Sequence, residues 1–216
     1  MSGLSYRARL PPRAEVAVVG AGAAGLGVAA SLRRRGIEAI VLERSAVASS
    51  WRARYEGVRL NTVRWMSSLP GMGIPRSAGR WPTRDELIAY MERYAERERL
   101  DVLTGVSVER IERDGERYRL RTSTGDLQAR FVVVAAGYDH TPSIPAWPGR
   151  DGFTGELLHS AEYRNATRFY GKQCSWPASA TRGLRSPPSS SAQARAFRSR
   201  CVPRPTCCGA RSSASP

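Results

Sequence analysis

The sequence predicts an α/β fold, in which a Rossmann-like dinucleotide-binding domain with a parallel sheet, helices and an antiparallel β-meander precedes an irregular tail. Three observations lead to this prediction. The apolar run at residues 15–19 leads into a glycine-rich turn and a helical pattern. Three short strand-like segments with glycine-containing turns between them follow later in the chain. Beyond Glu162 the composition changes, because ten of the 34 basic residues and none of the 19 acidic residues follow it.

The N-terminal part predicts a strand, a turn, a helix and a second strand. Residues 1–13 are polar and end near two prolines, so we expect a loose leader. Residues 15–19 form the short apolar run of a buried parallel strand. Residues 23–35 predict a helix, because basic residues in the last turn and Gly36 after it are typical of a helix C-terminus. Residues 39–42 predict the second strand.

The middle of the chain predicts one amphipathic helix and the meander. Thr83 is followed by Glu86 in the spacing of a capping box, so we expect a helix that extends to Arg99. The three strands of the antiparallel meander are expected at residues 106–111, 117–122 and 127–134. The last strand leads into the small-residue loop Ala135-Ala136-Gly137 and a proline-rich segment.

The glycine turn has the spacing of a dinucleotide site. Gly20, Gly22 and Gly25 fit the pattern G-x-G-x-x-G between a strand and a helix. The first permits the tight turn, the second lets a pyrophosphate approach the backbone, and the third lets the helix pack on the strand. Glu43 follows Gly20 by 23 residues, at the end of the second strand, where a carboxylate accepts hydrogen bonds from a ribose. A plain small-residue turn is the alternative, but it explains only the glycines.

The elements after the second strand favour FAD over a nicotinamide dinucleotide. A classical nicotinamide domain continues with alternating strands and helices, whereas this chain predicts a linker, one helix, a meander and a small-residue loop. This order resembles the FAD-binding domain of the two-dinucleotide flavoproteins. The disulfide reductases among them require a redox-active cysteine pair soon after the second strand. The first 173 residues contain no cysteine, so that branch is excluded.

Further motifs resemble those of the flavin-containing monooxygenases. They are Trp51-Arg52, the segment VRLNTVRW at residues 58–65, Leu69-Pro70, and the pattern F-x-G-x-x-x-H-x-x-x-Y at residues 153–163. The resemblance covers about residues 14–172. It implies an FAD- and NADPH-dependent enzyme that oxygenates a small molecule such as an amine, a sulfide or a ketone. Three positions depart from the family pattern: Ser49-Ser50 stand where Gly-Gly is usual, and Ala136 stands where Thr is usual.

The resemblance also implies roles for single residues. It places Asn61, together with Thr62, beside the flavin ring, with a turn residue as the alternative for Asn61. Val106 resembles the position whose backbone meets the adenine, with a plain strand residue as the alternative, and Trp65 is assigned to the core. The expected cofactor-binding residues are Gly20, Gly22, Gly25, Glu43, Trp51, Arg52, Asn61, Thr62, Val106, Ala136 and Gly137, with Asn61 also catalytic.

The tail does not fit the predicted fold. Residues 173–216 hold all four cysteines, and Leu184 and Val202 are their only Leu, Ile or Val residues, so they cannot bury a core. Combining the last base of each codon with the first two of the next permits V-L-V-A-G-V-G-N-S-G-A-E-I-A from Gln173 onward. This reading resembles the strand and glycine motif with which the family binds NADPH. We therefore infer the loss of a single base near Gln173.

The expected domains follow from these inferences. They are a leader (1–13), an FAD-binding domain (14–138), a linker that leads to a missing NADPH-binding domain (139–172), and an aberrant, disordered basic tail (173–216). The chain as given is expected to be inactive alone. A stand-alone FAD-binding module and a nucleic-acid-associated protein with a functional basic tail are the alternatives.

We expect neither nucleic acid nor metal as a partner. The tail arginines are not interleaved with aromatic residues, and the cysteines lack the spacing of metal ligands. The most apolar N-terminal segment, residues 16–30, is too short and too rich in glycine to span a bilayer. Since no signal peptide is recognised either, we expect a cytoplasmic protein that acts on a small molecule.

Overall fold

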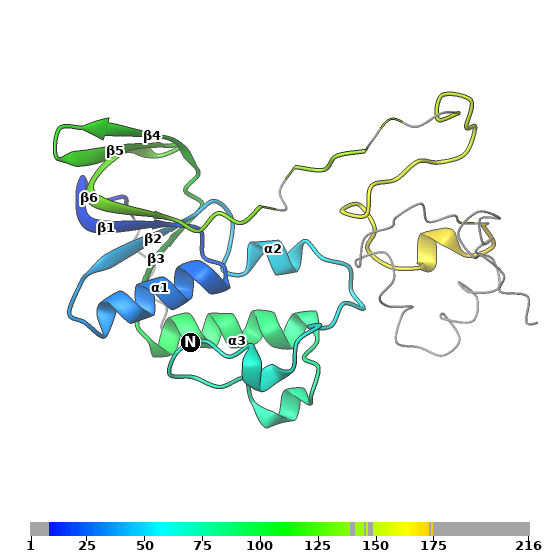
Figure 1. Cartoon of the computed structure of the whole chain (residues 1–216), viewed down its shortest axis with the longest axis horizontal. Helices are drawn as coiled ribbons and strands as arrows, with labels where there is room; N and C mark the ends of the chain where they lie inside the picture. Colours follow the sequence, from blue (N-terminus) through cyan, green and yellow to red (C-terminus); the bar gives the residue numbers. More distant parts are fainter. Residues whose placement is uncertain (1–8, 139–140, 145, 147–148, 173, 175–216) are drawn as a thin grey trace, which may run out of the picture. The chain divides into compact units, whose positions relative to one another are not determined.

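A six-stranded mixed sheet organises the N-terminal part of the chain (Figure 1). Four of its strands run parallel to one another. One of these four is also the final strand of an antiparallel meander. In spatial order the strands are β3 (Asp101–Thr104), β2 (Ala39–Glu43), β1 (Arg13–Val19), β6 (Gly125–Val134), β5 (Arg117–Thr122) and β4 (Val108–Asp114). Because β6 pairs with both β1 and β5, the predicted parallel sheet and the predicted meander form one continuous sheet.

The computed structural model describes residues 9–138, 141–144, 146, 149–172 and 174. The chain divides into two units, Met1–Arg54 with Arg59–Tyr163, and Tyr55–Val58 with Arg164–Pro216. Residues 1–8 of the predicted leader lie outside the described residues, and so does the predicted tail except for Cys174. In the second unit, the Glu56 amide donates to the Arg164 carbonyl oxygen at 2.9 Å. No helix among the described residues has the length and apolar character needed to cross a membrane.

Both predicted helices are present at the expected positions in the chain, but their last residues differ from the prediction. α1 (Ala23–Arg33) stops two residues before the predicted end, and Gly36 follows it at a φ of 73°. α3 (Arg84–Arg97) begins directly after Thr83. A one-turn helix, α2 (Ser49–Arg52), was not predicted. Three short 3-10 turns lie at Arg64–Met66, Arg76–Ala78 and Thr167–Phe169.

Two strand predictions need correction. β3 is missing from the prediction, because its four residues DVLT are too few for a periodic pattern. β4 begins at Val108 and not at Val106, because the Val106 amide donates to the Glu43 carbonyl oxygen at 3.0 Å. Val106 therefore belongs to the connection between β3 and β4, beside the end of β2.

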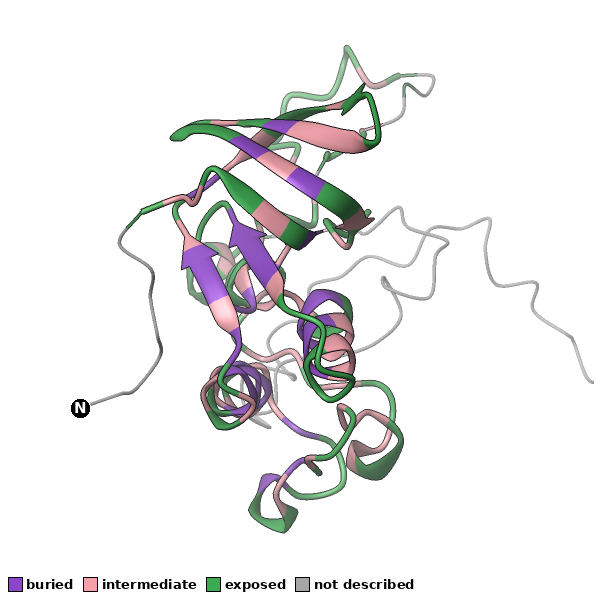
Figure 2. Cartoon of the chain, turned by 90° about the vertical axis from the view of Figure 1, so that its left-hand side faces the viewer, coloured by how far each residue is buried: buried purple, intermediate pink, exposed green. Residues whose placement is uncertain are grey.

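The sheet buries apolar residues on both faces. On one face Val16 and Val18 of β1 pack with residues of α1 and α3, including Leu26 and Tyr94. On the other face Ala17 packs with residues of β2 and the meander, among them Ile40, Leu42, Leu120 and Leu127. Figure 2 shows buried residues along the strands and on one side of the helices. Strands that are apolar on both faces are typical of the parallel part of a doubly covered sheet.

The predicted capping box at the start of α3 is confirmed. The amide and the hydroxyl of Thr83 donate to Glu86 Oε2, each at 2.8 Å, and the Glu86 amide donates back to Thr83 Oγ1. These donors hold the pKa of the Glu86 carboxyl below its usual value. The box fixes the start of a helix whose Leu87, Ile88 and Met91 are buried.

We expect the capping box to make stability depend on pH. The folded-state pKa of Glu86 is the lower one, so its contribution is complete above the unfolded value of about 4.3 and is lost as the pH falls through the folded value. Glu86→Gln should cost about 1 kcal/mol near neutral pH and should flatten the loss of stability below about pH 5. Urea unfolding at several pH values measures both. Glu96→Gln on the same helix is the control, and an equal flattening there would contradict the assignment.

Candidate functional site

The candidate site lies where the parallel strands end. Val19 pairs with Leu42 of β2 and with Val134 of β6, so the carboxyl ends of these strands meet at one edge of the sheet. The Gly20 amide donates to the Leu42 carbonyl oxygen, and the Ala135 amide donates to the Val19 carbonyl oxygen, both at 2.8 Å. The turn after β1 and the loop after β6 are therefore held side by side. In open α/β sheets, ligands bind outside this edge.

The three glycines have different surroundings. Gly20 has a φ of 106°, and a Cβ there would lie 2.5 Å from the Ala135 carbonyl oxygen. A Cβ on Gly25 would lie 1.9 Å from the Gly20 carbonyl oxygen. A Cβ on Gly22 would meet nothing within 4 Å. The fold itself therefore requires glycine at the first and third positions, whereas the second borders open space, as the approach of a phosphate to the backbone requires.

The N-terminus of α1 adjoins this open space. Gly22 is the N-cap residue, no side chain caps it, and the first turn carries no acidic residue. The first N–H groups of a helix lack partners within the helix, and the helix dipole is positive there. The Ala21 amide donates to Glu43, but no capping side chain occupies the backbone donors at the start of α1, which suits an anionic ligand.

Glu43 is buried at the end of β2, with a side chain only 4% exposed. The Ala21 amide donates to its Oε2 at 2.8 Å, and the Ser45 amide and the Ser49 hydroxyl donate to its Oε1 at 3.0 Å. The carboxylate thus ties the glycine turn to the segment that carries α2. Among the described residues the Ala21 amide is the one donor to Oε2, so this oxygen retains capacity to accept a further hydrogen bond.

Three further predicted residues lie at the same edge. Val106 is buried, and its amide donates to the Glu43 carbonyl oxygen, so its contact with the adenine stays a prediction. Ala136 and Gly137 are exposed in the loop after β6, where Gly137 has a φ of 78°. The structure thus brings Glu43 and Val106 together with the glycine turn and the start of this loop.

α2 places Trp51 and Arg52 against the helical layer. Trp51 is half-buried and packs on the core. Arg52 donates from Nε to the Val47 carbonyl oxygen at 3.2 Å and forms an ion pair with Glu92 of α3. The Arg52 guanidinium is thus engaged within the protein, and the roles of both residues toward a flavin stay predictions.

Asn61 and Thr62 lie on a separate segment. The Leu60 amide donates to the Pro82 carbonyl oxygen at 2.8 Å, so the segment around Asn61 runs beside the one that leads into α3. Both side chains are exposed, and Thr62 Oγ1 lies 2.5 Å from Ser67 Oγ. No hydrogen bond described in the structure joins this segment to the glycine turn. The catalytic role of Asn61 therefore stays a prediction.

Ser45 and Ser49 are site residues that the sequence analysis missed. Ser49 stands where the family pattern has glycine, and its hydroxyl donates to Glu43 Oε1. A hydroxyl residue six positions after a buried acid is a weak sequence signal for a hydrogen bond between the two. The contact becomes evident only from the course of the loop after β2. Trp65 needs a correction as well: it was assigned to the core but is 58% exposed, because it lies in a 3-10 turn between arginines that stack on its ring.

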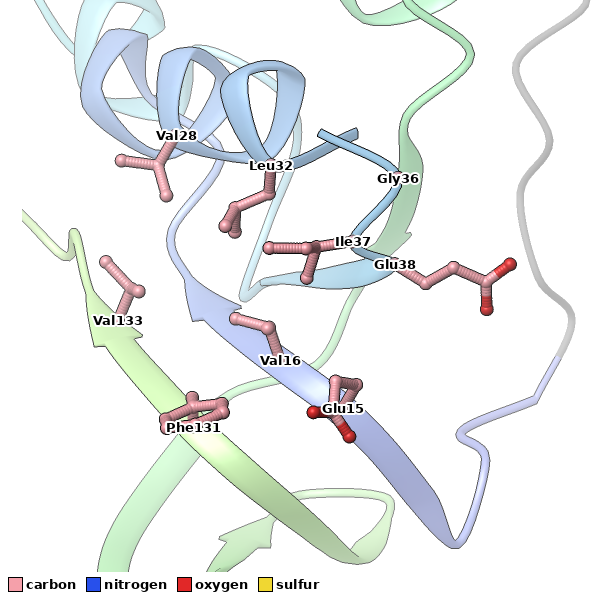
Figure 3. A pocket seen from close by; sticks show the side chains of 9 residues that line it. All are labelled: Glu15, Val16, Val28, Leu32, Gly36, Ile37, Glu38, Phe131 and Val133. Atoms are coloured by element: carbon pink, nitrogen blue, oxygen red, sulfur yellow. The ribbon is translucent and has the colours of Figure 1, made fainter. Parts of the chain in front are cut away.

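An apolar groove lies elsewhere, between α1 and the strands beside it (Figure 3). Its lining includes Val16, Leu32, Ile37, Phe131 and Val133. None of the expected cofactor-binding residues contributes to it. The groove offers no array of polar donors, so the glycine-turn edge remains the candidate site.

A model of the family described as pyridine nucleotide-disulphide oxidoreductase matches residues 17–175. The indole-3-pyruvate monooxygenase YUCCA1 of Oryza sativa subsp. japonica is 38% identical over 161 residues, which are 72% of this chain and 40% of that protein.

Two solved structures share the architecture. The flavin-containing monooxygenase from Stenotrophomonas maltophilia is 32% identical with a TM-score of 0.69, over 74% of this chain and 49% of that one. An oxidized steroid monooxygenase bound to NADP is 32% identical with a TM-score of 0.57, over 72% of this chain and 32% of that one. These similarities confirm the predicted fold class. The chain spans about half the length of these relatives, or less.

Proposed function

Because the chain belongs to the pyridine nucleotide-disulphide oxidoreductase family and, within it, to the flavin-containing monooxygenases, we propose that it supplies the FAD-binding segment of an NADPH-dependent enzyme that oxygenates a small molecule. One observation carries the proposal: the open space at Gly22 beside the uncapped N-terminus of α1. Backbone donors and room for close approach are what a pyrophosphate needs.

The residues at the site fit FAD. The N–H groups at the start of α1 would hold the pyrophosphate, Glu43 Oε2 would accept from a ribose hydroxyl, and the backbone of Val106 would contact the adenine. FAD, when bound, supplies the redox and oxygen chemistry, and NADPH is the family's reductant. Asn61 and Thr62 offer an exposed amide and hydroxyl for orienting groups at the flavin ring, while Ala136 and Gly137 leave the backbone of their loop accessible.

We expect the full chain to bind FAD in a one-to-one complex. FAD is titrated into the purified protein, and quenching of flavin fluorescence reports occupancy. NADH in excess should not displace it, since the elements after β2 form the meander of an FAD domain. A protein that takes up NADH and no flavin would overturn the proposal.

The proposal includes the predicted domains and the single-base loss near codon 173. The family match supports it, because it ends at residue 175, where the reading in the shifted frame begins to resemble the NADPH motif. The tail itself lies outside the described residues apart from Cys174.

Restoring one base at codon 173 is expected to give a longer protein that oxidises NADPH, whereas the 216-residue chain should not. The reason is that hydride delivery requires an NADPH-binding domain. NADPH consumption by both proteins, with FAD added, measures the difference. Robust consumption by the chain as given, or an intact reading frame on resequencing, contradicts the base loss.

We also propose that the protein is cytoplasmic and binds neither nucleic acid nor membrane. The family's small-molecule chemistry supports this proposal. Cell fractionation that recovered the protein with membranes or with nucleic acid would contradict it.

A further inference from the structure

We propose that residues 130–134 of β6 are an open sheet edge on which a second copy of this chain docks its own β6 in the antiparallel direction. The product is a twofold-symmetric dimer whose sheet continues from one copy into the other. The inference does not depend on the proposed function, because none of the expected cofactor-binding residues belongs to this stretch.

β6 is paired on both sides only over its first half. Its pairing with β5 ends where Tyr118 lies opposite Ala129, whereas its pairing with β1 continues to Val19 opposite Val134. Among the described residues, no strand pairs with the other side of residues 130–134. A strand that is paired on one side presents a row of N–H and C=O groups on the other, so this stretch can accept a further strand.

The side chains of this edge are apolar and exposed. Residues 131–134 are one phenylalanine and three valines, and Phe131 is 52% and Val134 65% exposed. The single charged residue, Arg130, stands at the start of the stretch, pairs with Glu15 at 3.0 Å and stacks on the Phe131 ring. The strand at the end of the sheet, β4, carries these charged residues: Glu109, Arg110, Glu112, Arg113 and Asp114. Charges of this kind block natural sheet edges, and residues 131–134 carry none.

The order of residues along the edge selects one register for a second copy. An antiparallel pair centred on Val132 places Val132 opposite its own counterpart, Phe131 opposite Val133, and Val134 opposite Arg130. Aromatic and β-branched residues that lie directly opposite each other stabilise antiparallel strands. A centre one residue later would place Phe131 opposite a residue beyond the end of β6, and a centre one residue earlier would need the side of Ala129 that Tyr118 occupies.

This register also joins the apolar grooves of the two copies. Figure 3 shows Phe131 and Val133 along β6 as part of the groove lining, with Val28 and Leu32 of α1 across from them. Residues two apart on a strand share a face, so the pairs of Phe131 with Val133 lie on the groove side of the shared sheet. The exposed part of the Phe131 ring then loses its contact with water, which favours association.

The contact is small, and its size limits the expected affinity. Residues 130–134 span about 17 Å of strand. An interface of this length lies at or below the about 1,200 Å² of total buried area that marks transient complexes. We therefore expect a reversible dimer with a dissociation constant in the micromolar range, and not an obligate one.

Sedimentation velocity of the full chain from about 1 to about 200 μM tests the association and should show a monomer–dimer equilibrium. Val134→Lys should raise the dissociation constant at least about tenfold, because the added ammonium would lie opposite Arg130 of the second copy and like charges directly opposite are destabilising. Met66→Lys is the matched control. It adds the same charge in place of an apolar side chain that is 77% exposed and lies outside the sheet, so it should leave the equilibrium unchanged.

Cysteine cross-linking tests the register. With the four native cysteines replaced by serine, Val132→Cys should give a disulfide-linked dimer on mild oxidation. The Cβ atoms of residues directly opposite each other are about 4.5–5.5 Å apart, close to the range that a disulfide bridges. Val134→Cys should cross-link far more slowly, because its two copies would be about 14 Å apart along the strands.

Each contrary result rejects the dimer or its register. A chain that stays monomeric over the whole concentration range overturns the inference, and so does equal weakening by Met66→Lys or equal cross-linking of the two cysteine variants. Amide hydrogen exchange at about 1 μM tests for another occupant: if every amide of residues 131–134 is protected in the monomer, a segment of the same chain covers the edge and the dimer is rejected. Circular dichroism shows whether Val134→Lys is folded. If it is not, Phe131→Thr replaces it, since it removes the aromatic pair, keeps a β-branched residue and should still weaken the dimer severalfold.

Discussion

Gly25→Ala is expected to destabilise the N-terminal domain by about 3 kcal/mol or more, whereas Gly22→Ala is expected to leave its stability unchanged and to abolish FAD uptake. The two substitutions add the same methyl group to the same turn. At Gly25 the methyl group would lie 1.9 Å from the Gly20 carbonyl oxygen, which is backbone and cannot rotate away, so α1 must move off β1. At Gly22 nothing lies within 4 Å, and the methyl group fills only the space assigned to the pyrophosphate.

The expected sizes follow from this difference. Overpacking a core costs about 1–3 kcal/mol of stability, and the clash of an added methyl group with a backbone atom should cost at least the upper value. The free energy of unfolding of a whole domain is only about 5–15 kcal/mol, so this cost is a large share of it. Urea unfolding measures the stability and fluorescence titration the FAD affinity. Gly73→Ala is the control, because its added methyl group would be 3.9 Å from Ser68 Oγ, an ordinary contact. A stable Gly25→Ala protein, or a Gly22→Ala protein with full FAD affinity, would refute the division of roles.

The sequence predicts the glycine turn well because two of its glycines, Gly20 and Gly25, lie where a Cβ atom would clash with backbone atoms. The spacing of Gly20 and Gly25 reflects backbone contacts that any residue with a Cβ would break. The place of Glu43 at the end of β2 follows from the same pattern. β3 and α2 escape prediction for the opposite reason, since four residues carry no periodic signal and only the neighbouring β2 and α3 specify them.

The surroundings of side chains are less predictable than their positions. Nothing in the order of residues shows that Ser45 and Ser49 both donate to Glu43, because the loop that returns them is set by tertiary packing. Trp65 is a second side chain whose surroundings the sequence does not reveal. An apolar residue in a loop favours a core assignment by composition, yet stacking of Arg64 and Arg80 on its ring stabilises it at the surface.

Glu43→Arg is expected to prevent FAD binding, chiefly because it disrupts the turn. The side chain is 4% exposed, and three donors, from Ala21, Ser45 and Ser49, point at its oxygens. An arginine there would place a cation against those donors in a buried site and leave them without an acceptor. Removing one partner of a buried charged cluster costs about 3–5 kcal/mol, so this variant alone does not separate folding from binding.

Glu43→Gln makes that separation possible, because it keeps the shape and one oxygen. It should lower stability by about 1–3 kcal/mol, since the amide nitrogen faces at least one N–H donor, and it should weaken FAD about tenfold by removing the charged acceptor for the ribose. Ser49→Ala is the matched control: it removes one donor to Oε1 but leaves Oε2 and its accepting capacity, so stability should fall by about 1 kcal/mol with FAD affinity nearly unchanged. Urea unfolding and FAD titration of the folded variants give the two quantities side by side. If Glu43→Gln loses stability and keeps full FAD affinity, the carboxylate serves only to tie the glycine turn to the α2 segment, and the ribose must be bound by another group.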